Sequence, residues 1–183
     1  MKNIVSILAI SLSLNSLAAQ DVVVKGPDEK LQLVVFVKDE ETPCYSVTYN
    51  GKAMLEKSPL GISTNIGDFT KALKLSGHSV EVIDTVYHQT RIKTSQIHYR
   101  ANELTCNLEN AQGQKIGIVF RVSNNDVAFR YTLPRQGGKG SVTVNHEQTG
   151  FRFPRQTTTF LCPQSDAMIG WKRTKPSYEE DYK

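Results

Sequence analysis

The sequence has few cysteines, and their arrangement excludes a disulfide-stapled scaffold. Cys44, Cys106 and Cys162 are an odd number and lie far apart, so they allow at most one disulfide bond. Cys44 and Cys106 fall in strand-like patterns, where a cysteine packs as a small apolar residue. The four histidines are scattered singly, and none lies at zinc-ligand spacing from a cysteine. This distribution argues against a zinc site.

Several motifs of enzyme chemistry are also missing. The chain has no G-x-S-x-G nucleophile elbow, no H-E-x-x-H and no phosphate-binding loop, because the glycine-rich stretch 137–140 lacks the flanking strand and helix that such a loop needs. The formal net charge is only +4, and the basic residues are spread along the chain. Nucleophilic catalysis, nucleotide chemistry and nucleic-acid binding therefore have no support.

Long hydrophobic runs are absent except at the N-terminus. One lysine, Lys2, precedes an apolar run of about 14 residues from Ile4 to Leu17, and the small residues Ala18 and Ala19 follow. This pattern predicts a signal peptide over residues 1–19, since the run is shorter than the roughly 20 residues of a membrane-spanning helix. We expect the chain to be secreted across the inner membrane and to be periplasmic or associated with the outer membrane. No cysteine closely follows the signal peptide, so a lipoprotein anchor is not indicated.

Alternating apolar residues indicate strands through most of residues 20–183, which we expect to form one domain. The run Leu31–Val37 predicts a central strand buried on both faces. Tyr45–Tyr49 and Ala53–Leu55 flank Asn50-Gly51, which predicts a hairpin with a type I′ turn. Residues 80–90 also alternate. Asp68–Gly77 is interpreted as a short helix with Asp68 as N-cap and Gly77 as C-cap.

The clearest pattern is a meander of three strands. Its apolar sets are Leu104/Cys106/Leu108, Ile116/Ile118/Phe120/Val122 and Val127/Phe129/Tyr131/Leu133. Short gaps with turn residues separate these sets, as in antiparallel hairpins. Two shorter strands are expected at Val142/Val144 and Phe151/Phe153. The predicted fold class is therefore all-β, an antiparallel sandwich or barrel.

Candidate functional residues are few. Acidic residues that a glycosidase could use as its pair of carboxylates are Glu103, Glu109, Glu147, Asp166, Glu179, Glu180 and Asp181. Spacing does not show which of them meet, so no catalytic or metal-binding residue is assigned. Trp171 is the only tryptophan and is the one candidate carbohydrate-binding residue, although it could equally anchor a core or a domain contact. Arg121 and Arg130 lie on the polar sides of their strands and are expected to pair with acidic groups.

Several stretches together resemble a known family, the N-terminal domain of glycoside hydrolase family 97, secreted enzymes of Bacteroidetes. The matching stretches are Gly26-Pro27-Asp28, Tyr45–Lys52, Ser58-Pro59-Leu60-Gly61, Asn102-Glu103-Leu104, Phe120-Arg121-Val122, Val127–Tyr131 and Pro134. Two places depart from the family. Asp126 stands where the family often has a glycine, a position that Asp can occupy if its φ is positive, and residues 86–99 match poorly, so the strand register there is open.

The resemblance implies a super-sandwich like that of galactose mutarotase, incomplete at its C-terminal end, followed in full-length members by a (β/α)8 catalytic barrel. It also implies exo-acting, calcium-dependent α-glycosidases that act on α-linked oligosaccharides, some of them inverting α-glucosidases and others retaining α-galactosidases. The family's catalytic carboxylates lie on the barrel, and its calcium-ligating Glu of the N-terminal domain lies beyond the point that matches Lys183. We therefore expect no catalysis from this chain alone.

Three hypotheses remain open at this point. The chain is the front part of such an α-glycosidase, a stand-alone secreted carbohydrate-binding sandwich, or an interaction module. Residues 162–183 run without a closing strand, which favours the first hypothesis and a continuation of the polypeptide. If later strands belong to the same sheets, a sheet edge and the apolar residues beneath it are expected to be exposed.

Overall fold

The computed structural model describes residues 21–38, 42–91, 93–135 and 141–160. It divides into two units, residues 1–152 and 153–183. The described part of the first unit contains strands and no helix. The strands are β1 (Val22–Lys25), β2 (Leu31–Phe36), β3 (Cys44–Tyr49), β4 (Lys52–Pro59), β5 (Ile62–Thr64), β6 (Gly67–Asp68), β7 (Lys74–His88), β8 (Gln96–Glu109), β9 (Lys115–Val122), β10 (Val127–Thr132) and β11 (Val144–Glu147). The all-β prediction is confirmed.

The first sheet is antiparallel with the order β1-β2-β3-β4. Burial alternates along β2, with Leu31, Leu33 and Val35 buried and the residues between them half-buried. The strand is interior as predicted, but only one of its faces is fully buried. The turn between β3 and β4 is confirmed, because Asn50 and Gly51 have φ values of 48° and 76°, the two positive angles of a type I′ turn.

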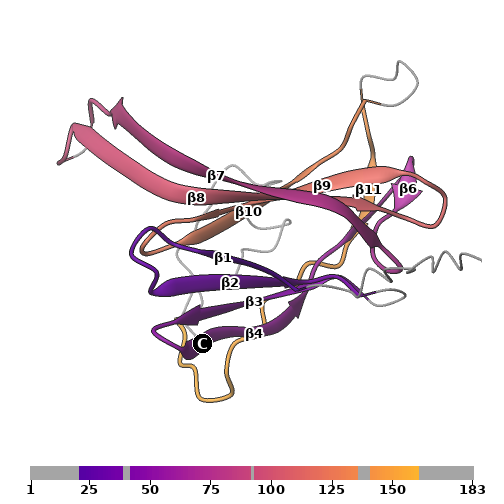
Figure 1. The fold of residues 1–183 in the computed structure, drawn as a ribbon, viewed down its shortest axis with the longest axis horizontal. Coiled ribbons are helices and arrows are strands. Elements are labelled where there is room, and N and C mark those ends of the chain that lie inside the picture. The colour runs from indigo at the N-terminus through magenta and orange to yellow at the C-terminus, as the bar shows by residue number, and fades with distance from the viewer. Residues whose placement is uncertain (1–20, 39–41, 92, 136–140, 161–183) are drawn as a thin grey trace, which may run out of the picture. The chain divides into compact units, whose positions relative to one another are not determined.

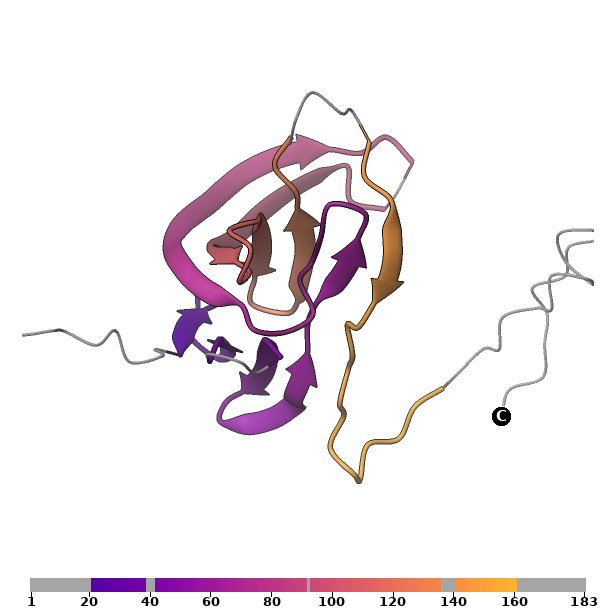
Figure 2. The same ribbon diagram turned by 90° about the vertical axis from the view of Figure 1, so that its right-hand side faces the viewer.

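The second sheet has the order β10-β9-β8-β7 and contains the predicted meander. Short turns fix its register, which pairs Val122 with Val127 and Glu109 with Lys115. The hairpin β7–β8 is much longer than its neighbours and curves strongly (Figure 2). Since β9 pairs only with Asn102–Glu109, the part of the hairpin formed by residues 83–101 extends beyond β9 as a two-stranded arm.

The two four-stranded sheets lie over one another and enclose the core (Figure 1). The inward sets of the meander pack against the buried residues of β1, β2 and β3, among them Val24, Leu33 and Tyr45. Tyr45, Phe120 and Phe129 form a tilted aromatic cluster with ring centroids 5.5–6.1 Å apart. Such pairs add about 0.5–1.5 kcal/mol each to the stabilisation from area burial. The sandwich is thus held by one continuous apolar layer.

A third, small sheet has the order β11-β5-β6, and β11 lies beside β5 in Figure 2. The stretch 58–61 leads into it from the first sheet. Ser58 is fully buried; its hydroxyl donates to the carbonyl of Glu56 and accepts from the amide of Arg152. Gly61 has a φ of 139°, and its amide donates to the hydroxyl of Tyr131 at 2.8 Å. The hydrogen bonds of Ser58 and the positive φ of Gly61 explain why a serine and a glycine stand at the two ends of this junction.

The predicted helix over Asp68–Gly77 is wrong. The carboxylate of Asp68 accepts hydrogen bonds from the amide and hydroxyl of Thr70, so it forms a local turn and does not cap a helix. Ala72 has a φ of 52°, which no α-helix contains. Phe69 and Leu73 are both buried and anchor an irregular crossing segment. The strand β7 begins at Lys74, inside the predicted helix.

Other expectations are corrected at the ends of strands. β11 begins at Val144, two residues after the expected Val142. No strand forms at Phe151 or Phe153. The segment is only partly paired with β4: the Arg152 carbonyl accepts from the Glu56 amide, but the Arg152 amide donates to the side-chain oxygen of Ser58. Asp126 is not among the residues with positive φ. Its carboxylate instead accepts from the hydroxyl of Ser123 at 2.6 Å and closes the turn.

Cys44 and Cys106 lie in strands as predicted. Cys106 is fully buried in the core, and burial raises its pKa to about 12. Cys44 is half-buried, with its thiol directed to the carbonyl of Thr42 at 3.3 Å. Cys162 lies outside the described residues, as do the signal peptide and Trp171. The described residues contain no helix with the length and apolarity that a membrane crossing needs.

Candidate functional site

A hollow of about 500 Å³ lies on the outer face of the β7–β10 sheet, at the end where β9 begins and β10 ends, and its lining includes the core residue Ile116 and the core-packed Leu133. Its lining comes from four neighbouring strands and the segment that follows β10. The lining residues are Ser76, Asn107, Lys115, Ile116, Gly117, Thr132, Leu133 and Pro134. The volume is within the range of about 300–1,000 Å³ found for small-molecule sites.

The register of the strands explains the hollow. Gly77 pairs with Asn107, Asn107 with Gly117, and Gly117 with Thr132, so these residues form one row across the outer face. Asn107 therefore stands between two positions that have no side chain. A Cβ at Gly117 would come within 2.2 Å of Thr132 Oγ1, so the glycine allows the threonine side chain to lean over it.

A β-bulge shapes one wall of the hollow. The register between β7 and β8 shifts between Leu75 and Gly77, which leaves Ser76 as the extra residue. The Ser76 hydroxyl donates to the backbone carbonyl of Asn107 at 3.0 Å. Bulges redirect side chains and often stand beside functional sites. Here the bulge brings a hydroxyl to the row that contains the Asn107 amide.

The chemistry of the lining is that of neutral and cationic donors. Asn107 supplies an amide, Lys115 an ammonium, and Ser76 and Thr132 hydroxyls. No carboxylate is among the residues that line the hollow. Pro134 adds an apolar edge, and the other apolar lining residues, Ile116 and Leu133, pack against the core. The arrangement can donate several hydrogen bonds to a polar ligand and place an apolar face beside it.

The acidic residues considered from the sequence do not gather within the described part of the chain. Glu103 is paired with Arg121 across β8 and β9, as expected for that arginine. The hydrogen bond to Glu103 raises the pKa of Arg121. Glu109 ends β8 opposite Lys115, and Glu147 is exposed on β11. The remaining candidates, Asp166, Glu179, Glu180 and Asp181, lie outside the described residues.

The expected pairing of the second arginine is not found. No acidic residue of the described ranges forms an ion pair with Arg130. Within those ranges no three histidine, cysteine or acidic side chains lie together in a way that would hold a metal ion. Glu103 therefore has a structural partner, and the described carboxylates do not form a metal site.

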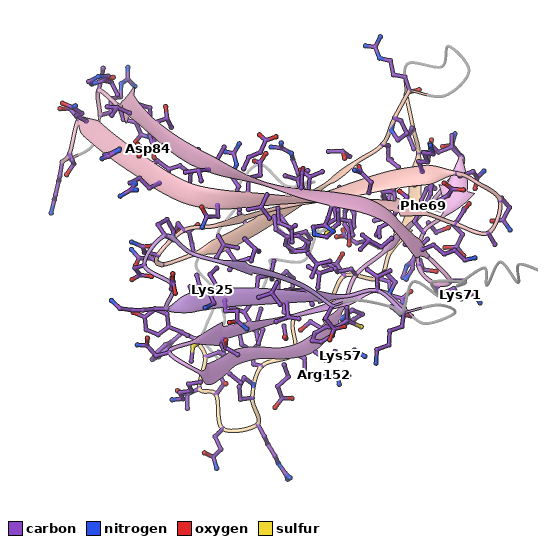
Figure 3. All side chains as sticks on the ribbon, in the orientation of Figure 1. Lys25, Lys57, Phe69, Lys71, Asp84 and Arg152 are labelled. Carbon is purple, nitrogen blue, oxygen red and sulfur yellow. The ribbon has the colours of Figure 1, made fainter. Side chains whose placement is uncertain are left out.

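The arm of the β7–β8 hairpin is a second surface feature (Figure 3). Asp84 lies on it and contacts both His98, at 2.5 Å, and Arg100, at 3.1 Å. The hydrogen bond to His98 is the main cause that lowers the pKa of Asp84. Val86 and Tyr87 of the arm are exposed, as are Val80 and Val82 just before it on β7, Val82 at 71%. β7 is an edge strand of the described sheet, so it presents an apolar strand surface at that edge.

The fold is a β-sandwich domain. One of its sheets carries a polar recess that is large enough for a small-molecule ligand. The sequence of this domain matches the family model described as glycosyl-hydrolase 97 N-terminal over residues 24–183. The chain belongs to this family. The resemblance drawn from the motifs is confirmed.

Curated relatives are glycosidases. A probable retaining alpha-galactosidase of Streptomyces bingchenggensis is 34% identical over 138 residues, which are 74% of this chain and 20% of that protein. The retaining alpha-galactosidase of Bacteroides thetaiotaomicron is 27% identical over 160 residues, 86% of this chain and 23% of that protein. The chain thus spans less than a quarter of the length of these relatives.

Solved structures agree in fold. The crystal structure of a beta-arabinopyranosidase is 82% identical, with a TM-score of 0.84 over 90% of this chain and 26% of that one. A glycoside hydrolase family 97 enzyme of Pseudoalteromonas sp. strain K8, in complex with panose, is 23% identical with a TM-score of 0.66 over 73% of this chain and 20% of that one. The second likeness is one of fold alone.

Proposed function

We propose that this chain is the N-terminal sandwich domain of a secreted exo-glycosidase that removes terminal β-arabinopyranosyl or α-galactosyl residues from oligosaccharides. The observation that carries the proposal is the 82% identity, over 90% of the chain, to a beta-arabinopyranosidase. The similarity to retaining alpha-galactosidases supports the second sugar. In this proposal the domain supports a catalytic (β/α)8 barrel of the same polypeptide and borders its carbohydrate site.

The two sugars belong together for a stereochemical reason. A β-L-arabinopyranoside has the ring configuration of an α-D-galactopyranoside and lacks only the exocyclic hydroxymethyl group. One catalytic centre can therefore orient both rings in the same way. Discrimination between the two sugars then depends on whether the site accommodates the hydroxymethyl group. A pocket distinguishes substrates that differ by a group of about that size by only about 1–3 kcal/mol of transition-state binding energy.

The retaining relatives support a double-displacement reaction in the parent enzyme. A retaining glycosidase needs two carboxylates about 5–5.5 Å apart, one of them a nucleophile and the other an acid and base. In our proposal both come from the barrel, and a calcium ion there serves the sugar site, with no ligand from the described residues. The contribution of this domain is structural, through the rigid sandwich held by the core of Tyr45, Phe120 and Phe129.

The test uses the complete polypeptide that contains this chain, assayed with 4-nitrophenyl β-L-arabinopyranoside, α-D-galactopyranoside and α-D-glucopyranoside. We expect the arabinopyranoside and galactopyranoside to be hydrolysed with ratios of kcat/KM within about 10- to 200-fold of one another. The 183-residue chain alone should hydrolyse none of them. Preferred hydrolysis of the glucopyranoside would refute the proposed sugars, and activity of the chain alone would refute the division of roles.

Three further measurements address the remaining parts of the proposal. Proton NMR of the first-formed sugar should show the anomer of the substrate, because retention preserves the anomeric configuration. Removal of calcium with a chelator should abolish hydrolysis, and added calcium should restore it.

Fractionation of cells that express the polypeptide should place it outside the inner membrane, and deletion of residues 1–19 should leave it in the cytoplasm.

A further inference from the structure

The two glycines beside Asn107 have no conformational reason to be glycine. Neither Gly77 nor Gly117 has a positive φ, so any residue could adopt their backbone angles. A Cβ at Gly77 would meet no atom within 4 Å, so packing inside the domain does not exclude a side chain there. Glycine within a strand often marks a bulge or a place where another group approaches closely. Gly77 follows the bulge at Ser76, and Gly117 makes room for Thr132 Oγ1. Together the two glycines leave the Asn107 side chain without a neighbouring side chain in its row.

We propose that the hollow on the outer face of the β7–β10 sheet is a saccharide-binding site. Its ligand is a neutral mono- or disaccharide unit held by Asn107, Lys115 and Thr132. The amide and ammonium groups donate to ring hydroxyls, and the Thr132 hydroxyl both donates and accepts. The apolar ring of Pro134 receives the C–H face of the sugar. The site is a property of this chain and does not depend on the substrate proposed for the parent enzyme.

The lining argues for a polyol over other ligands. Divalent metal ions such as calcium prefer carboxylate and carbonyl oxygens, and no carboxylate lines the hollow. A phosphate site is usually built from several cations or from converging backbone amides, whereas Lys115 is the one cationic side chain among the lining residues. Hydroxyl-rich sugars need several separate donors and acceptors, which is what the row supplies.

A protein segment fits the hollow less well. The centre of a protein interface is enriched in aromatic residues, Met and Arg and depleted in Lys and Ser. The lining of the hollow has the opposite composition, with Ser76 and Lys115 present and no aromatic residue. Its shape is also concave and small, as in small-molecule sites. None of the large hydrophobic side chains that are exposed among the described residues, such as Val82 and Tyr87, lines this recess.

The test is a titration of the isotope-labelled 183-residue chain with L-arabinose, D-galactose and lactose, followed by amide NMR. We expect saturable shifts centred on Asn107, Lys115, Gly117 and Thr132, with a Kd on the order of 1 mM for the best sugar. Sodium galacturonate and inorganic phosphate serve as further probes. Saturable shifts at the hollow with phosphate and with no neutral sugar would overturn the proposal, as would no saturable shift there with any sugar.

Two variants separate the site from general surface effects. Lys115→Met removes the ammonium and keeps the stem of an exposed side chain, and Asn107→Leu removes the amide with little change in volume. Each should weaken sugar binding at least threefold, because each removes one hydrogen bond to the sugar. Lys52→Met, at an exposed turn of the other sheet, is the matched control and should leave binding unchanged.

The interpretation of these variants depends on folded protein, so circular dichroism spectra of all variants should match that of the unaltered chain. If Asn107→Leu does not fold, Lys115→Met alone tests the proposal, because Lys115 is exposed and its replacement should not disturb the fold. Equal affinity of Lys115→Met and the unaltered chain would place the ligand elsewhere and overturn the assignment. Loss of glycosidase activity in the parent would leave this result unaffected, so the two proposals can fail separately.

Discussion

Replacement of Gly61 by alanine should be among the most damaging single-methyl additions in this chain. The residue has a φ of 139°, in a region that is essentially reserved for glycine. A Cβ there would lie 2.8 Å from the carbonyl oxygen of Phe69 and 2.8 Å from the Cα of Thr70. Both are backbone atoms, so neither can move aside by a rotamer change. The carbonyl of the same glycine also accepts from the amide of Gln148, which ties the junction to the segment after β11.

The magnitude follows from two independent costs. An unfavourable φ costs about 1–3 kcal/mol, and overpacking against fixed atoms costs about 1–3 kcal/mol. Gly61→Ala should therefore lower the free energy of unfolding by about 2–6 kcal/mol, a large share of the roughly 5–15 kcal/mol of a typical domain.

Two other glycines separate the costs. Gly51 has a φ of 76°, and a Cβ added there would meet no atom within 4 Å, so Gly51→Ala should cost only the conformational part, about 1–2 kcal/mol. Gly77 has neither constraint. Gly77→Ala should change the free energy of unfolding by less than about 1 kcal/mol, in the stabilising direction, because it restricts the unfolded chain.

Urea denaturation of the three variants, followed by circular dichroism, measures these differences. We expect the urea midpoint to be highest for Gly77→Ala, lower for Gly51→Ala and lowest for Gly61→Ala, with similar m-values. If Gly61→Ala unfolds at the same urea concentration as Gly51→Ala, the close backbone approach at Phe69 does not exist in solution and the description of the junction is refuted.

Three further predictions concern the core and the arm. Tyr131→Phe should cost about 1–3 kcal/mol in urea denaturation, because it leaves the amide and the hydroxyl that bond to the phenol without their partner. Burial raises the pKa of Tyr45 and of Cys106 to about 12, so both stay protonated in the folded chain while the unfolded chain loses these protons from about pH 9 upward. The free energy of unfolding should therefore fall between about pH 9 and 12, and a Tyr45→Phe variant should fall less steeply. Leu104→Ala should cost about 2–5 kcal/mol, whereas Val82→Lys on the exposed part of β7 should stay within about 0.5 kcal/mol of the unaltered chain; equal effects of the two would contradict the burial described for them.

The meander and the β3–β4 hairpin could be predicted because their signals are local. Alternating apolar residues fix the inward face of each strand, and the turn at Asn50-Gly51 leaves little choice of conformation. The helix at Asp68–Gly77 was predicted wrongly for a physical reason. Asp68 is equally suited to a turn as to an N-cap, and the decisive contact, the amide of Phe69 with the carbonyl of Ile62 at 2.9 Å, is made by another part of the chain.

The hollow could not be recognised one strand at a time, because it depends on how three strands align. Gly77, Asn107 and Gly117 are far apart in sequence, and each alone is an ordinary polar-face residue. The signal that could have found them is the register of the predicted hairpins: the pair Val122 and Val127 leads, five residues further along each strand, to Gly117 and Thr132. The site proposed from a single residue, Trp171, lies outside the described residues and stays a prediction.

The pairing of β5 with β11 has a consequence for how the chain is made. Ile62 pairs with Glu147, so β5 has no partner on this side until about 80 further residues have been synthesised. At about 5–20 residues per second, that delay is roughly 4–16 s, whereas hairpins such as those of the meander form within about 1–10 μs. The β7–β10 sheet can therefore form as the chain emerges, while β5 still lacks this partner. Synthesis from the N-terminus thus sets an order of assembly in which β11, the last strand of the described residues, completes the pairing of an early one.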